Sequence, residues 1–266
     1  LFEPCYDAYV PVVRLNGGTP RFVTLRAPDY RIDWSEVRRA LSSRTRLLII
    51  NSPHNPTGAV VDADDLRQLA EVVDGTPVIV LSDEVYEHII FDGRVHESVA
   101  RHPDLRRRSC VVSSFGKSYH TTGWKVGYVA APQSLTAEIQ RVHQFVTFAT
   151  NTPIQMAYAD FTRRRTTYGD LATFYQAKRD RFLQLLEGSR FLPVPCHGTY
   201  FQILDYSAIS DEPDHAFAIT LLKEHGVASI PTSAFLYNSD APRVLRFCFA
   251  KKDETLAGAA ERLRKV

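Results

Sequence analysis

Short apolar segments alternate with longer amphipathic ones along most of this chain, and this alternation limits the fold more than any other feature. The short segments have the β-branched and aromatic content of buried strands, whereas the longer ones have helical periodicity. We expect strands at 22–25, 47–51, 78–82, 110–113 and 126–130, and helices at 34–41, 62–73, 135–149 and about 170–187. Strands and helices that alternate in this way form a mostly parallel sheet flanked by helices, so the sequence predicts an α/β fold.

The pattern changes after residue 187. Pro193, Pro195 and Gly198 mark a break in the chain. The segments beyond it predict strands at 200–204, 227–230 and 244–249, and helices at 214–225 and 253–265. We therefore expect two domains joined by the long helix, a large one over residues 1–165 and a smaller C-terminal α+β domain over residues 166–266.

The composition argues against several classes of protein. The net charge is only +2 and no long basic run occurs, so no nucleic-acid partner is expected. No apolar stretch is long enough to cross a membrane. The four cysteines lie far apart and form no C-x-x-C pair, which favours reduced thiols and a cytoplasmic location over a disulfide framework or a zinc site.

Polar clusters follow four of the predicted strands, at the edge where α/β sheets bind ligands. The first is NSPHNPTG, residues 51–58. Its Ser-Pro and Asn-Pro steps favour a rigid, extended turn, because a residue before proline avoids the α region. Such a turn can hold the Asn55 amide outward as a hydrogen-bond donor. The alternative is an ordinary loop between a strand and a helix.

The second cluster is SDEVY, residues 82–86, which also ends an apolar strand. A carboxylate in that position is poorly solvated and needs a cationic partner or a metal. Asp83 and Glu84 have no histidine or further acid at ligand spacing, so we expect no metal site. Ser82 or Asp83 could instead cap a helix.

The third cluster is SSFGKSYHTTGWKVGY, residues 113–128, which combines glycines and hydroxyls with Lys117 and Lys125. Hydroxyl groups beside a lysine suit a phosphate group. Ser114 and Lys117 also form S-x-x-K, the nucleophile motif of penicillin-binding enzymes. That interpretation requires later S-D-N and K-T-G elements, and neither occurs in the sequence.

The fourth cluster is VLRFCFA, residues 244–250, in the C-terminal block. Arg246 interrupts an otherwise apolar strand. A guanidinium group there needs an acidic partner within the protein or a carboxylate ligand bound by both of its arms. Either a structural salt bridge or a substrate site fits this segment.

The order of these four clusters resembles that of the class I/II aminotransferases, which are fold-type I enzymes dependent on pyridoxal 5′-phosphate. The resemblance covers the whole chain. It is closest to the methionine aminotransferase and kynurenine/glutamine transaminase group, on phrases such as EPCYDAYVP, NSPHNPTG, SDEVYEHI, SSFGKSYHTTGWKVGY and QFVTFATNTP.

The resemblance implies a role for each conspicuous side chain. Lys117 would bind the cofactor as a Schiff base and then carry the substrate's α-proton. Asp83 would pair with the ring nitrogen and keep it protonated, which makes the ring an electron sink. Asn55 and Tyr86 would hydrogen-bond the phenolic oxygen of the ring, and Asn55 would also contact the substrate.

The remaining implied roles concern the rest of the cofactor and the substrate. Ser114 and Lys125 would hold the phosphate group; Lys125 stands where many relatives have arginine. Tyr6 would stack on the face of the ring. Arg246 would bind the α-carboxylate of the substrate and so orient its Cα bonds.

The implied reaction consists of two half-transfers. An amino acid of methionine, aromatic, glutamine or kynurenine type gives its amino group to the cofactor, and a 2-oxo acid then takes it. The family also implies a homodimer and about a hundred residues before the point where this sequence starts. We therefore expect residues 1–266 by themselves to bind the cofactor poorly.

Two other functions fit the same residues. One is a cysteine-S-conjugate β-lyase, in which the carbanion expels a leaving group from the β-carbon. The other is the aminotransferase-like effector domain of a transcriptional regulator, which would carry a DNA-binding segment at its N-terminus.

Overall fold

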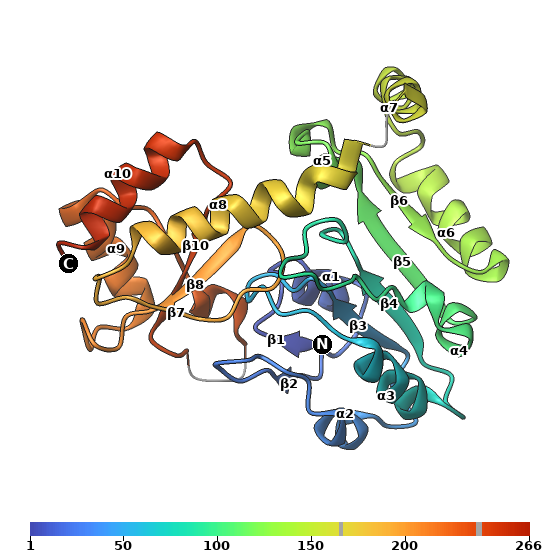
Figure 1. Ribbon diagram of the computed structural model, residues 1–266. Helices are drawn as coiled ribbons and strands as arrows, with labels where there is room; N and C mark the ends of the chain where they lie inside the picture. The colour runs from blue at the N-terminus through green and yellow to red at the C-terminus, as the bar shows by residue number, and fades with distance from the viewer. Residues whose placement is uncertain (165–166, 238–240) are drawn as a thin grey trace.

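A four-stranded sheet lies at the centre of the N-terminal part of the chain (Figure 1). The computed structural model describes residues 1–164, 167–237 and 241–266. The sheet has the order β3 (Leu47–Asn51), β4 (Ile79–Asp83), β5 (Ser109–Ser114) and β6 (Gly127–Ala130). The first three strands are parallel and β6 runs antiparallel to β5. The expected α/β class and mostly parallel sheet are therefore confirmed.

Helices and two short strands surround this sheet. The helices are α1 (Tyr9–Leu15), α2 (Trp34–Ala40), α3 (Ala63–Val73), α4 (Pro103–Arg106), α5 (Phe115–Ser118), α6 (Gln133–Val146) and α7 (Thr152–Arg164). The short strands β1 (Phe2–Glu3) and β2 (Val23–Thr24) pair in parallel. Helix α3 shows why such elements form here. It begins at a capping box between Asp62 and Asp65, and it buries Leu66 and Leu69 on one face.

The C-terminal part contains a second, antiparallel sheet. Its order is β7 (Leu192–Pro193), β8 (Phe201–Asp205), β10 (Val244–Cys248) and β9 (Ile230–Pro231). Helices α9 (Asp214–His225) and α10 (Asp253–Leu263) accompany it. The long helix α8 (Leu171–Leu185) runs from the neighbourhood of α5 to this sheet and packs along α10 (Figure 1).

Two apolar clusters form the core, and each contains residues of both parts. The first joins side chains of β3, β4, α2 and α3 to Ile203 and Val244 of the second sheet. The second joins α8, α9 and α10 to Tyr86, Ile89 and Phe91, which follow β4. The expected boundary between residues 165 and 166 lies outside the described residues, so the two-domain division stays a proposal. This shared packing fixes the C-terminal sheet against the edge where β3 and β4 end.

Most elements lie where the sequence places them, and the differences have physical causes. Strand β3 and helix α9 have the expected bounds, whereas the expected strand at 227–230 is wrong because only Ile230–Pro231 pairs, at the outer edge of its sheet. Helices α1 and α7 were not expected. No helix in the described ranges is long and apolar enough to cross a membrane.

Candidate active site

The carboxyl ends of β3 and β4 are tied together by an asparagine. Asn51 and Asp83 are partners in the strand register. The side-chain amide of Asn51 donates to the Asp83 carbonyl oxygen at 2.8 Å, and its Oδ1 accepts from the backbone N–H of Asn55 at 2.8 Å. Two turns separated along the chain thus share one edge, and Asn55 is held over the end of β4.

Asp83 is a carboxylate with few neighbours able to neutralise it. Its Oδ2 accepts from the Tyr9 hydroxyl at 2.5 Å, and its Oδ1 accepts from the backbone N–H of Val85 at 3.1 Å. Burial raises the pKa of the Asp83 carboxyl, while these two hydrogen bonds oppose the rise. Burial, together with the Asp83 charge, also raises the pKa of the Tyr9 hydroxyl. A cationic ligand atom beside Asp83 would therefore be bound favourably.

Lys117 lies among tyrosine rings. It belongs to the short helix α5, which Ser114 caps. Its Nζ donates to the Tyr200 hydroxyl at 2.8 Å, and it lies 5.7 Å from the centre of the Tyr86 ring. Tyr86 and Tyr200 are edge-on to each other at 5.3 Å. Burial raises the pKa of the Tyr86 hydroxyl, so this group remains a hydrogen-bond donor at neutral pH.

Arg246 reaches this site from the second sheet. Its Nη1 donates to Asn55 Oδ1 at 2.6 Å, although 191 positions separate the two residues. The guanidinium group lies 4.0 Å from the centre of the Phe201 ring and 4.7 Å from that of Phe235. Burial lowers the pKa of Arg246 from its usual value. Among the described residues Arg246 forms no salt bridge within the protein, and its polar partner is the side-chain amide of Asn55.

The two groups expected to hold phosphate lie at neighbouring strand ends. Ser114 ends β5, and its Oγ accepts from the backbone N–H of Gly116 at 3.2 Å. Lys125 is exposed just before β6. The backbone N–H of Phe115, which follows Ser114, donates to the carbonyl oxygen of Val126, which follows Lys125, at 3.1 Å. An alanine Cβ at Gly116 would lie 2.9 Å from the Thr122 backbone, so the chain is tightly folded here. Ser114 and Lys125 therefore stand at the two ends of the connection between β5 and β6.

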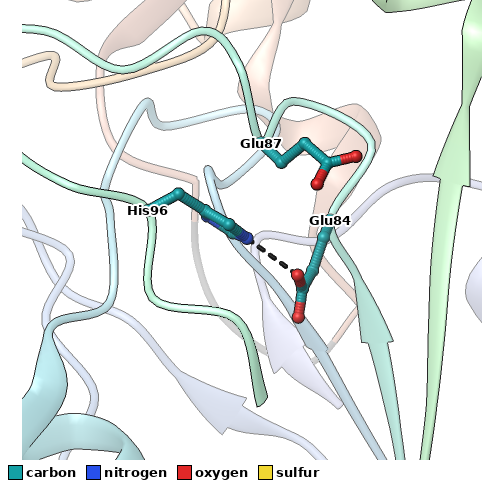
Figure 2. Close-up of side chains that lie close together, drawn as sticks. All are labelled: Glu84, Glu87 and His96. Carbon is teal, nitrogen blue, oxygen red and sulfur yellow. Dashed lines mark hydrogen bonds and ion pairs between the residues drawn. The ribbon is translucent and has the colours of Figure 1, made fainter. Parts of the chain in front are cut away.

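Glu84 is an internal anchor (Figure 2). Its Oε2 lies 2.7 Å from His96 Nε2, and its Oε1 accepts from the Ser82 hydroxyl at 2.8 Å and from the Val99 backbone N–H at 3.1 Å. Glu87 lies close enough for the three side chains to hold a metal ion. The spacing of residues along the chain therefore did not predict this group of possible metal ligands, because His96 approaches Glu84 only in the folded protein. Protein donors already contact both Glu84 oxygens, so the group stabilises the segment after β4.

Several residues in this site were missed by sequence reasoning. Tyr9 and Tyr200 each contact an expected site residue, and Phe201 packs under Arg246. Tyr6, in contrast, was expected, and it packs edge-on against Tyr9 at 5.6 Å. In the sequence, Tyr9 is marked only by its place three residues after Tyr6, and Tyr200 only by its place at the start of a predicted strand after Gly198. Neither position specifies which residue the tyrosine contacts.

Comparison with known proteins identifies the family. Residues 1–263 match the family "Aminotransferase class I and II". The chain belongs to this family. Class I and II aminotransferases depend on pyridoxal phosphate and transfer an amino group between an amino acid and a 2-oxo acid, so this chain is a transaminase of that type. The expected family, activity and cofactor are confirmed.

Individual relatives are similar over the whole chain. The methionine aminotransferase of Escherichia coli (strain K12) is 48% identical over 266 residues, which are 100% of this chain and 69% of that protein. The kynurenine–oxoglutarate transaminase of Dictyostelium discoideum is 35% identical, over 100% of this chain and 70% of that protein.

Solved structures agree with this aminotransferase fold. An Escherichia coli protein with methionine aminotransferase function has a TM-score of 0.97 at 48% identity, over 100% of this chain and 70% of that one. The N-succinyldiaminopimelate aminotransferase from Mycobacterium tuberculosis has a TM-score of 0.94 at 36% identity, over 99% of this chain and 70% of that one.

The donor set at the strand ends fits the cofactor. A buried carboxylate, Asp83, is available for the ring nitrogen, and the Tyr86 hydroxyl is available for the phenolic oxygen. The amine of Lys117 lies within contact range of the Tyr86 ring. The Ser114 hydroxyl and the exposed ammonium group of Lys125 stand at the two ends of the connection between β5 and β6. These are the four kinds of partner that the cofactor requires.

Proposed function

We propose that the edge where β3, β4 and β5 end is the active site of an amino-acid aminotransferase. The observation that carries the proposal is the 2.6 Å contact between Arg246 and Asn55. It brings the one arginine of the fourth cluster to the strand edge that already contains Asp83 and Lys117. A carboxylate bound by Arg246 would therefore lie beside the groups that suit the cofactor.

Six side chains besides Lys117 bind the cofactor in this proposal. Asp83 keeps a proton on the ring nitrogen, and the Tyr9 hydroxyl holds the Asp83 carboxylate in place. Tyr86 donates to the phenolic oxygen, while Ser114 and Lys125 bind the phosphate group. Asn55 assists at the phenolic oxygen, and Tyr6 stacks on the ring. When bound, pyridoxal phosphate supplies the carbonyl group that accepts the amino group and the ring that withdraws electrons from Cα.

Lys117 has two tasks. Its Nζ is the attachment point for the cofactor, and after substrate has displaced it, the same nitrogen moves the α-proton of the substrate. A positioned base of this kind contributes about 10²- to 10⁴-fold to a proton transfer. Arg246 fixes the α-carboxylate with its planar fork, so that the bond to the departing proton faces Lys117.

The substrates proposed are amino acids of methionine, aromatic, glutamine or kynurenine type, with a 2-oxo acid as acceptor. The relatives named for methionine and for kynurenine support this range. The rings of Phe201 and Phe235 beside Arg246 also favour donors with apolar side chains.

We further propose a homodimer in the cytoplasm. Phe145 and Phe148 are each 84% exposed at the end of α6, and all four residues of β6 are exposed at the edge of the sheet. A second copy of the chain would cover such an apolar surface. Free thiols at all four cysteines are consistent with a reducing compartment.

The test uses the protein expressed from its complete gene. Borohydride reduction in the presence of pyridoxal phosphate, followed by digestion and mass spectrometry, is expected to label Lys117 and to leave the Lys117→Ala variant unlabelled and inactive. A matched control is Lys178→Ala, which changes a lysine on α8 whose partners are Asp253 and the Lys251 carbonyl. Attachment of the cofactor at any other lysine would contradict the assignment.

A donor screen then tests the substrate class. Methionine, phenylalanine, glutamine and kynurenine are each combined with a panel of 2-oxo acids, and the new amino acid is quantified. Release of pyruvate and ammonia from a cysteine S-conjugate, without amino transfer, would identify a β-lyase instead.

A further inference from the structure

Tyr200 is the polar group that touches the reactive nitrogen. It lies directly before β8, in the C-terminal part, and its carbonyl oxygen accepts from the Phe249 backbone N–H at 3.0 Å. Its hydroxyl oxygen accepts from Lys117 Nζ at 2.8 Å. A residue of the C-terminal part thus contacts Lys117 in α5 across 83 positions.

The Tyr200 ring is held from several sides. It is edge-on to Tyr86 at 5.3 Å, packs on Phe201 at 4.7 Å and tilts against Tyr175 at 5.6 Å. The ring therefore has little freedom to move, and the hydroxyl is aimed by packing. Such pre-positioning lowers the entropic cost of holding a partner.

A hydroxyl group suits both protonation states of an amine. It accepts a hydrogen bond from an ammonium group, and it can also donate one to the lone pair of a neutral amine. The Lys117 nitrogen also lies 5.7 Å from the centre of the Tyr86 ring, within the range of a cation–π contact. Asp83 and Arg246 are the charged groups that act on Tyr86, and Asp83 also interacts with Lys117.

We propose that Tyr200 is a positioning residue that holds Lys117 Nζ whenever this nitrogen is not attached to the cofactor. The inference rests on the role of Lys117 proposed above. In the half-reaction, the free amine of Lys117 would otherwise be mobile at the end of its flexible four-carbon side chain. Tyr200 keeps it beside the ring of Tyr86, and so within reach of the proton that it transfers.

Tyr200→Phe tests this because it removes the hydroxyl, with its hydrogen bonds to Lys117 and to the Tyr86 side chain, and keeps the aromatic contacts. We expect kcat to fall roughly 10- to 100-fold, since a misplaced base loses much of its contribution, with little change in KM for the amino acid. Tyr175→Phe is the matched control. It packs on the same ring and its hydroxyl pairs with His120, but it does not touch Lys117. We expect its kcat to stay within about twofold of the wild type.

A second readout does not depend on turnover. The full chain, freed of cofactor, is treated with trace acetic anhydride, and the acetylation of Lys117 relative to the other lysines is measured by mass spectrometry. Loss of the hydroxyl frees the amine, so we expect Lys117 to be labelled several times faster in Tyr200→Phe and at the wild-type rate in Tyr175→Phe. Placing 4-aminophenylalanine at position 200 restores a polar group whose nitrogen is a weaker acceptor than the hydroxyl oxygen, so we expect a labelling rate between those of wild type and Tyr200→Phe.

The outcomes separate this inference from the proposed function. Unchanged labelling in Tyr200→Phe, or changed labelling with unaltered kcat, overturns the role of Tyr200. If Tyr200→Phe does not fold, the 4-aminophenylalanine variant decides: because its nitrogen accepts more weakly, labelling of Lys117 faster than in wild type supports the role, and labelling at the wild-type rate overturns it. Cofactor attachment away from Lys117 would instead remove the proposed function itself.

Discussion

Gly58 holds the first cluster against the C-terminal part, and replacing it is expected to be costly. It has a φ of +76°, a conformation that side chains with a Cβ rarely adopt. An alanine Cβ there would lie 2.7 Å from Cys196 Sγ and 3.1 Å from the Gly198 carbonyl oxygen. The Gly58 carbonyl also accepts from the His197 N–H at 2.9 Å, so the backbone cannot move away freely.

The size of the effect follows from two separate contributions. The left-handed conformation costs a residue with a Cβ about 1–2 kcal/mol. Forcing a methyl group into occupied space costs about 1–3 kcal/mol more. Gly58→Ala should therefore lower the free energy of unfolding by about 2–5 kcal/mol.

Gly75→Ala is the matched control. Gly75 has a similar φ of +64°, but an added Cβ there would meet no atom within 4 Å. Only the conformational cost of about 1–2 kcal/mol is expected for it. Urea denaturation followed by circular dichroism measures both variants. Equal destabilisation of the two would refute the reasoning, because it would mean that the contact with Cys196 and Gly198 imposes no constraint.

Three further predictions concern charge. Arg246→Lys replaces the planar fork that meets Asn55 by a point charge, and steady-state kinetics should show kcat/KM for the amino acid reduced roughly 10- to 150-fold, the equivalent of about 1.5–3 kcal/mol. Hydrogen bonds from Arg179 lower the pKa of Asp92 from 3.8 to about 2, so the pair stabilises the folded state above pH 3.8 and this contribution is lost as the pH falls towards 2. The difference in unfolding free energy between wild type and Asp92→Asn, from urea denaturation at several pH values, should therefore shrink over that window, and a constant difference would contradict the prediction. Burial lowers the pKa of His54 from 6.5 to about 4, so as the pH falls the imidazole is protonated in the unfolded chain before it is protonated in the folded one. The free energy of unfolding should therefore decrease as the pH falls from 6.5 to 4, and His54→Gln should show a shallower decrease in the same measurement.

The fold class follows from the sequence because periodicity and capping are local properties. Segments 47–51 and 214–225 have the bounds of β3 and α9, and Asp62 caps α3 as the acidic first turn suggests. Strand Ile230–Pro231 was placed less well, since a single neighbour at the sheet edge decides how many of its residues pair.

The same distinction between local sequence and distant contacts applies to the candidate active site. The sequence alone determined which side chains stand at strand ends, namely Asn55, Asp83 and Lys117, because a strand's end is read from its own residues. Only the tertiary structure decided what meets them. Tyr9 reaches Asp83 and Tyr200 reaches Lys117 over 74 and 83 positions. Such contacts depend on how α1 lies against the end of β4 and how the C-terminal part lies against α5, which no spacing along the chain records.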